Sequence, residues 1–91
     1  MYRLSFLSSG TGSLTATIIH AIKKGILKNI TPVSIISDRE SKSLQLTSLF
    51  GGTSHIVDFN ASHSREEFSN KVLEIFQNEK IDFSFMTFDR V

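Results

Sequence analysis

The sequence has 91 residues, 40% of them hydrophobic, with ten basic and nine acidic side chains that give a net charge of +1. This length allows one small domain with a single core. The charge is too small to indicate a nucleic-acid or membrane partner. There is no cysteine, no signal-peptide pattern and no apolar stretch long enough to span a bilayer, which together predict a cytoplasmic protein.

Segments typical of strands alternate along the chain with segments typical of helices. Alternating or β-branched apolar residues predict strands at 2–9, 31–38, 54–59 and 81–86. Apolar residues spaced three and four apart predict helices within 14–25, 41–52 and 62–80. The β-α-β-α-β-α-β order is that of an α/β protein. We therefore expect a parallel, Rossmann-like half-sheet with right-handed crossovers.

Each predicted helix carries an apolar stripe that is expected to face the sheet. The stripe of the first helix consists of Leu14, Ile18, Ala21 and Ile22. That of the second consists of Leu46, Leu49 and Phe50. That of the last consists of Phe68, Val72, Ile75 and Phe76. Ser64 is the expected N-cap of the last helix and forms a capping box with Glu67.

If the strand order is 3-2-1-4, the fourth strand lies at an edge of these four strands, although it would be central in a sheet that continues beyond them. Phe83, Phe85 and Met86 then sit on or near an unpaired strand. Because an unprotected apolar edge pairs readily with other strands, we expect the chain to associate with itself through this strand at high concentration.

A glycine-containing loop joins the first strand to the first helix and contains Gly10, Gly12 and Ser13. In a parallel α/β sheet this loop lies at the carboxyl ends of the strands, where ligands bind. Glycines let the backbone come close to a ligand, and the start of a helix favours an anion. The loop therefore suits a phosphate. The alternative is a tight strand-to-helix turn in which Ser13 only caps the helix.

The loop does not match the common nucleotide fingerprints. A dinucleotide site has a third glycine where this chain has Thr15, and no G-K-[ST] sequence follows for a Walker loop. Asp38 could act as the ribose-binding acid of a dinucleotide site. It is followed by Arg39 and Glu40, however, and a solvated turn explains these three residues equally well.

Taken together, four stretches resemble the N-terminal half of glycinamide ribonucleotide (phosphoribosylglycinamide) formyltransferase. They are LSSGTGSLTATIIHAIKKGIL, ISDRESKSLQLTSLFGG, SREEF and IDFSFMTFDRV. The resemblance extends in order over essentially the whole chain. Enzymes of this family transfer a formyl group from 10-formyltetrahydrofolate to glycinamide ribonucleotide in purine synthesis. The resemblance implies that fold and activity, 10-formyltetrahydrofolate as the co-substrate, glycinamide ribonucleotide as the partner, and no metal.

The resemblance also implies site residues, position by position. The substrate-phosphate loop falls on Gly12, Ser13 and Leu14, where the family loop S-G-x-G-S-N has asparagine in place of Leu14. A folate-contacting arginine falls on Arg65. The segment along the folate falls on residues 87–91, given a deletion of one residue within the fourth strand, and its folate-binding residues are Asp89, Arg90 and Val91. Asp89 replaces an apolar residue there.

The catalytic asparagine, histidine and aspartate of this family belong to its second half, and no residue here matches them. Among the chain's three histidines, His20, His55 and His63, none has a serine or cysteine and a carboxylate arranged with it by sequence as a nucleophile system. The resemblance therefore implies that residues 1–91 form one substrate-binding domain without the catalytic half, inactive alone. The alternatives are a non-catalytic phosphate-binding module and a formyltransferase of another substrate.

Overall fold

The computed structural model of the chain describes residues 1–8, 12–57 and 65–87. Its elements are β1 (Tyr2–Ser8), α1 (Ser13–Lys23), β2 (Ile30–Ser37), the 3-10 helix η1 (Lys42–Leu49), β3 (Thr53–Ile56), α2 (Arg65–Asn78) and β4 (Phe83–Thr87). The predicted alternation of strands and helices is confirmed. Gly10, His63 and the expected N-cap Ser64 lie outside the described residues.

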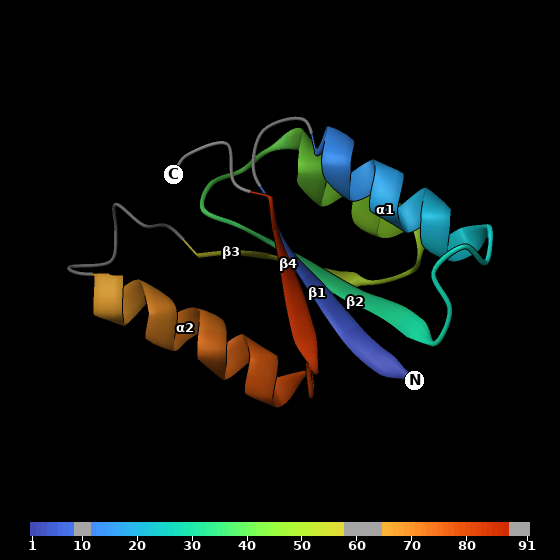
Figure 1. The fold of residues 1–91 in the computed structure, drawn as a ribbon. Coiled ribbons are helices and arrows are strands. Elements are labelled where there is room, and N and C mark those ends of the chain that lie inside the picture. The colour runs from blue at the N-terminus through green and yellow to red at the C-terminus, as the bar shows by residue number, and fades with distance from the viewer. Residues whose placement is uncertain (9–11, 58–64, 88–91) are drawn as a thin grey trace.

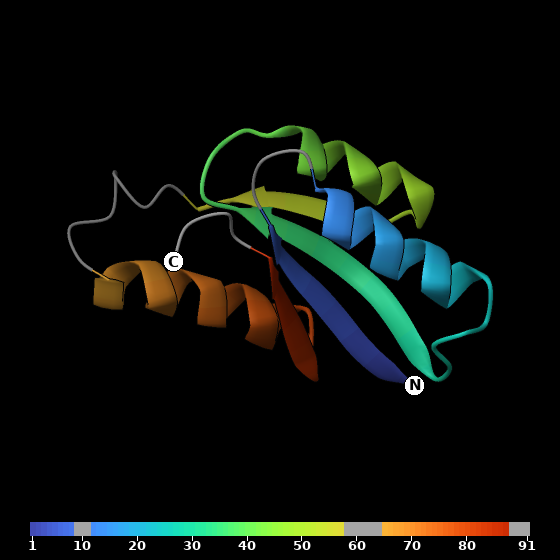
Figure 2. The same ribbon diagram turned by 45° about the horizontal axis from the view of Figure 1, so that its top comes forward.

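The four strands form one parallel sheet in the order β3-β2-β1-β4, as the sequence predicted. Helices α1 and η1 cover one face and α2 covers the other (Figure 1). Figure 2 shows the same two-sided arrangement from a second direction. No helix in the part of the chain that the structure describes has the length and apolar character needed to cross a bilayer.

The core is divided by the sheet into two clusters. On the side of α1 and η1 the buried residues are Leu4, Phe6, Ile19 and Ile35. On the side of α2 they are Leu7, Ile36, Val57 and Val72, with Phe68, Ile75 and Phe76 packed against them. The stripe predicted for the last helix is therefore confirmed, since all four of its residues pack in this second cluster.

The stripe predicted for the first helix is correct only in part. Ile18 and Ile22 pack against the core, but Leu14 is 53% exposed, and the fully buried positions are Thr15 and Ile19. Positions 15, 18, 19 and 22 share one face at helical spacing, so the stripe is centred one residue later than expected. The sequence pattern did not indicate this position of the stripe, because Thr15 is polar and was not counted among the apolar residues.

The second helical segment is a 3-10 helix and not the α-helix that its apolar spacing suggested. The Thr47 hydroxyl donates to the Leu44 carbonyl at 2.9 Å, and the Ser48 hydroxyl donates to the Gln45 carbonyl at 2.9 Å. Both bonds span three residues. Serine and threonine hydroxyls that compete for backbone carbonyls weaken an α-helix, and a short segment can accept the tighter 3-10 turn.

Candidate functional site at the carboxyl ends of the strands

The start of α1 lies at the carboxyl end of β1, at the centre of the sheet edge. Gly12 is the N-cap residue of α1, with φ 74° and ψ 25°, and its carbonyl accepts the Ala16 amide at 2.8 Å. Gly12 has no side chain, and among the described residues no side-chain hydrogen bond caps this helix start. Ser13 is therefore the first helical residue and not the cap that the plain-turn interpretation required.

Gly12 is held in a tight contact with η1. A Cβ atom at this position would lie 2.7 Å from the Ser43 Cβ and 2.9 Å from Leu46 Cδ1. The positive φ and this contact both require glycine. The sequence suggested that glycines here let a ligand approach. The structure adds that Gly12 lets the start of α1 approach η1.

Buried hydroxyls fasten the strand ends to the helix starts. Thr15 Oγ1 donates to Ser8 Oγ at 3.1 Å, which ties α1 to the last residue of β1. A second chain of hydroxyls runs from Ser37, the last residue of β2, through Ser41 to Ser43, with oxygen–oxygen distances of 3.2 and 2.7 Å. The two helix starts are thus fixed relative to the sheet edge before any ligand binds.

The exposed part of the site consists of Ser13 and Leu14 in the first turn of α1. The first amides of an α-helix have no carbonyl acceptor within the helix, and the helix dipole places partial positive charge there. This arrangement can bind an anion. Leu14 brings no polar side chain to that first turn.

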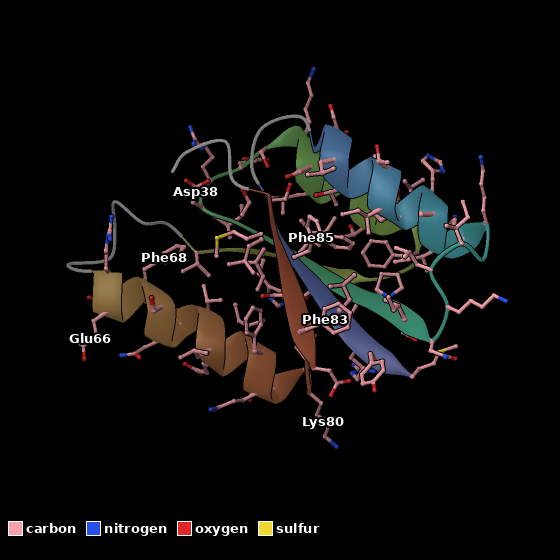
Figure 3. The ribbon with its side chains drawn as sticks, viewed as in Figure 1. Asp38, Glu66, Phe68, Lys80, Phe83 and Phe85 are labelled. Atoms are coloured by element: carbon pink, nitrogen blue, oxygen red, sulfur yellow. The ribbon has the colours of Figure 1, made fainter. Side chains whose placement is uncertain are left out.

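Arg65 is exposed and is the first residue of α2. The carboxyl end of α2 reaches the amino ends of the strands, where the Arg3 guanidinium Nε donates to the Glu79 carbonyl at 2.8 Å. Arg65, at the other end of α2, therefore lies at the carboxyl ends of the strands. Gly12 lies at this same end of the sheet but on the opposite face (Figure 3, where Glu66 marks this end of α2). Asp89, Arg90 and Val91 lie outside the described residues.

Asp38 and Arg39 form an ion pair directly after β2, with 3.3 Å between Asp38 Oδ1 and Arg39 Nε. Since the Arg39 side chain is 50% exposed, this is a solvated turn of the kind that the sequence left open as the alternative to a ribose-binding acid. Beside it lies a shallow depression lined by Glu40, Ser41, Lys42, Leu44, Gln45, Ser54 and Ile56. Across the described residues, no three His, Cys, Asp or Glu side chains gather as metal ligands would.

The structure reveals one polar cluster that the sequence did not indicate. Glu79 Oε2 accepts the Thr53 hydroxyl at 2.7 Å and lies 3.1 Å from His55 Nε2. These residues come from β3 and from the end of α2, so no local motif could signal their contact. The Thr53 hydroxyl donates directly to the carboxylate. Thr53 Oγ1 and Glu79 Oε2 both approach the same histidine nitrogen, His55 Nε2. A catalytic relay instead places the hydroxyl and the carboxylate on opposite ring nitrogens.

The Glu79 cluster therefore has a structural role at the amino ends of the strands. Burial alone raises the pKa of the Glu79 carboxyl. The hydrogen bonds with Thr53 and His55 are the main causes that outweigh burial, and they hold the pKa below its ordinary value of 4.5. The ionised carboxylate, which directly follows α2, thus stabilises the fold by joining the end of that helix to β3.

We expect Glu79→Gln to lower the free energy of unfolding at pH 7 by about 1–3 kcal/mol, the usual cost of weakening a largely buried hydrogen bond to a charged group. A lowered pKa stabilises the folded state above the ordinary value of 4.5, and this contribution is lost as the pH falls through the folded-state pKa. Urea denaturation should therefore show the variant and the wild type converging below pH 4.5. Glu74→Gln, on the exposed part of α2, is the control and should change little. An equal gap at pH 7 and pH 3 would contradict the assignment.

Comparison with known proteins gives matches at the level of the fold. No protein-family model matches this chain, and no curated protein matches it in sequence. Among solved structures, phosphoribosylglycinamide formyltransferase from Bacillus halodurans has a TM-score of 0.88 with 22% identity over 98% of this chain. Glycinamide ribonucleotide transformylase 1 from Symbiobacterium toebii has a TM-score of 0.88 with 25% identity over 100% of this chain.

A formyltetrahydrofolate deformylase from Burkholderia mallei has a similar fold, with a TM-score of 0.79 and 16% identity over 93% of this chain. The resemblance to glycinamide ribonucleotide formyltransferases that the sequence suggested is thus confirmed for the fold. The chain spans 46% of the Bacillus protein, 43% of the Symbiobacterium protein and 29% of the deformylase. It is similar to less than half of each of these proteins.

Proposed function

We propose that residues 1–91 form the substrate-phosphate-binding domain of a phosphoribosylglycinamide formyltransferase. Its partners are glycinamide ribonucleotide and the co-substrate 10-formyltetrahydrofolate. The observation that carries the proposal is the start of α1, where the N-cap is Gly12 and the exposed first turn contains Ser13 and Leu14. The choice of substrate is supported by the fold, because 98–100% of this chain is similar to glycinamide ribonucleotide formyltransferases.

In this proposal the substrate phosphate binds against the backbone of Gly12, Ser13 and Leu14. The amides of the first turn donate to the phosphate oxygens, and the helix dipole favours their charge. The Ser13 hydroxyl can add one hydrogen bond. Leu14 cannot, and binding at that position depends on its amide alone.

The folate is proposed to lie along Arg65 and the chain end at Asp89, Arg90 and Val91. Arg65 is exposed at the start of α2, where its guanidinium can pair with a carboxylate of the folate's acidic tail. Asp89 places a carboxylate near the same acidic ligand and is expected to weaken its binding.

The reaction joins the glycinamide amine to the formyl carbon as the bond from that carbon to the folate nitrogen breaks. It needs a group that removes the amine proton and returns a proton to the folate nitrogen, and a donor to the developing oxyanion. We assign neither role to residues 1–91. Their contribution is to hold the phosphate and one wall of the folate cleft, so that the amine of the substrate is oriented.

We expect the purified chain to bind glycinamide ribonucleotide in calorimetry, to bind the dephosphorylated nucleoside at least tenfold more weakly, and to show no formyl transfer. A preference for the phosphorylated compound tests the proposed phosphate site at the start of α1. The absence of turnover tests the proposal that the catalytic groups lie outside residues 1–91. Equal binding of both compounds would contradict the proposed substrate site. Turnover that survives repurification would require catalytic residues within this chain.

A non-catalytic phosphate-binding module is the second candidate. It is favoured by the site at Gly12, Ser13 and Leu14, because backbone amides and a helix dipole bind a phosphate without selecting the rest of the ligand. Such a module would bind inorganic phosphate or ribose 5-phosphate as tightly as glycinamide ribonucleotide. Calorimetry with inorganic phosphate and ribose 5-phosphate, added to the series above, therefore separates the two candidates.

A further inference from the structure

One carboxylate oxygen of Glu79 is buried without a hydrogen-bond donor. Glu79 Oε2 accepts the Thr53 hydroxyl and lies 3.1 Å from His55 Nε2. Glu79 Oε1 is also buried, but it has no hydrogen-bond partner within the part of the chain that the structure describes. An ionised carboxylate can only accept, and a buried acceptor without a donor destabilises the fold. The large majority of such buried atoms are bonded to protein or to ordered water.

The two cations beside Glu79 do not supply the donor for Oε1. Arg3 Nε donates to the main-chain carbonyl of Glu79 and not to its carboxylate. Lys80 follows Glu79 directly, but it is exposed and its side chain points away from the sheet (Figure 3). The donor for Oε1 is therefore to be sought on the buried side of the carboxylate, toward the sheet.

Hydroxyl side chains line the sheet where Glu79 meets it. One register row runs across all four strands and consists of Ser84, Ser5, Ser34 and Thr53. Ser5 and Ser34 each lie two residues before Leu7 and Ile36, so they face α2 as that apolar pair does. Serine fills much less space than leucine or isoleucine. This part of the sheet is therefore polar and leaves room between the strands and the end of α2, the conditions that a buried water needs.

Ser34 is the hydroxyl of this row that lies in place to serve Oε1. It is the register partner of Thr53, whose hydroxyl binds the other oxygen of the same carboxylate. Burial raises the pKa of Glu79, and Ser34 is among the side chains, after Thr53 and His55, that lower it. No direct hydrogen bond joins Ser34 to Oε1, however. Two polar groups that lie near each other without direct contact are commonly bridged by one water.

We propose that a buried water molecule is bound between Glu79 Oε1 and the Ser34 hydroxyl. Ser5 Oγ and Ser34 Oγ, both fully buried, lie 2.8 Å apart. With Ser5 as the donor of that pair, Ser34 donates to the water, and the water donates to Oε1. All three donors then point toward the carboxylate, and hydrogen bonds aligned in this way strengthen one another. The water joins the end of α2 to β2, in addition to the direct bonds that join it to β3.

Oxygen-17 relaxation dispersion of the chain in water tests the site, because it counts long-lived water molecules and does not detect hydroxyl exchange. We expect Ser34→Val to show one long-lived water fewer than the wild type, since methyl groups replace the hydroxyl and fill the space. Ser84→Val changes the same register row two strands away and should retain the wild-type count. Circular dichroism verifies the folding of both variants. Equal counts in Ser34→Val and the wild type overturn the proposal, as does the same loss in Ser84→Val.

A high-resolution crystal structure of the wild type provides a second measurement that does not depend on the folding of a variant. We expect one water oxygen at about 2.5–3.0 Å from both Glu79 Oε1 and Ser34 Oγ. A direct hydrogen bond between these two atoms, with no water between them, overturns the proposal. So does a metal cation at this place, recognised by its shorter distances to the oxygens and by its loss from crystals grown without sodium and potassium salts.

Discussion

Gly12→Ala is expected to lower the free energy of unfolding by about 3 kcal/mol or to prevent folding. The added Cβ would lie 2.7 Å from the Ser43 Cβ and 2.9 Å from Leu46 Cδ1. Relieving such overpacking costs about 1–3 kcal/mol, and an L-residue at φ 74° adds about 1–2 kcal/mol. Urea denaturation of the variant measures the sum.

Gly25→Ala is the matched control for this prediction. Gly25 has a φ of 78°, but a Cβ there would meet nothing within 4 Å. Its variant should therefore show only the backbone cost, about 1–2 kcal/mol. Equal losses at the two glycines would contradict the tight contact between α1 and η1. Because Gly12 supports the fold, its variants cannot report ligand approach alone, and binding is better tested at Ser13.

Ser13→Asp is expected to reduce the affinity for inorganic phosphate or glycinamide ribonucleotide at least tenfold. The new carboxylate occupies the place of the phosphate at the start of α1, while its charge complements the helix dipole, so the melting temperature should stay the same or rise. Ser13→Ala removes one hydroxyl hydrogen bond and should cost less than about 1 kcal/mol of binding.

Ser13→Asn is the control for size and polarity without charge and should bind nearly as well as the wild type. Calorimetry and thermal melts of the three variants provide both measurements. If Ser13→Asp binds phosphate as tightly as the wild type, the loop is only a turn. That outcome would leave the fold assignment intact and remove the proposed ligand site.

The sheet was predictable because its strands are short runs of alternating or β-branched apolar residues, separated by helical segments. Strand order followed from the resemblance, and the exposure of Phe83, Phe85 and Met86 followed from that order. The apolar stripe of α1 was misplaced because a buried threonine, Thr15, is satisfied by Ser8, a contact that periodicity cannot show.

The position of the candidate site could be predicted from the sequence, but the long-range contacts that hold the surrounding elements in place could not. The loop before α1 was found from its glycines, but the close contact between Gly12 and Ser43 joins residues 31 positions apart. The pairing of His55 with Glu79 joins residues 24 apart and has no signal in spacing. Both depend on how the helices pack on the sheet, which residue pattern alone does not specify.

The most direct test of the proposed phosphate site is a titration of the isotope-labelled chain with glycinamide ribonucleotide, followed by amide chemical shifts. The account predicts saturable shifts at Ser13 and Leu14 that disappear in Ser13→Asp, with smaller effects at Lys42 and Ser43 across the contact with η1. Shifts confined to the depression at Glu40, Gln45 and Ile56, or no saturable shift at millimolar ligand, would contradict a phosphate cradle at the start of α1.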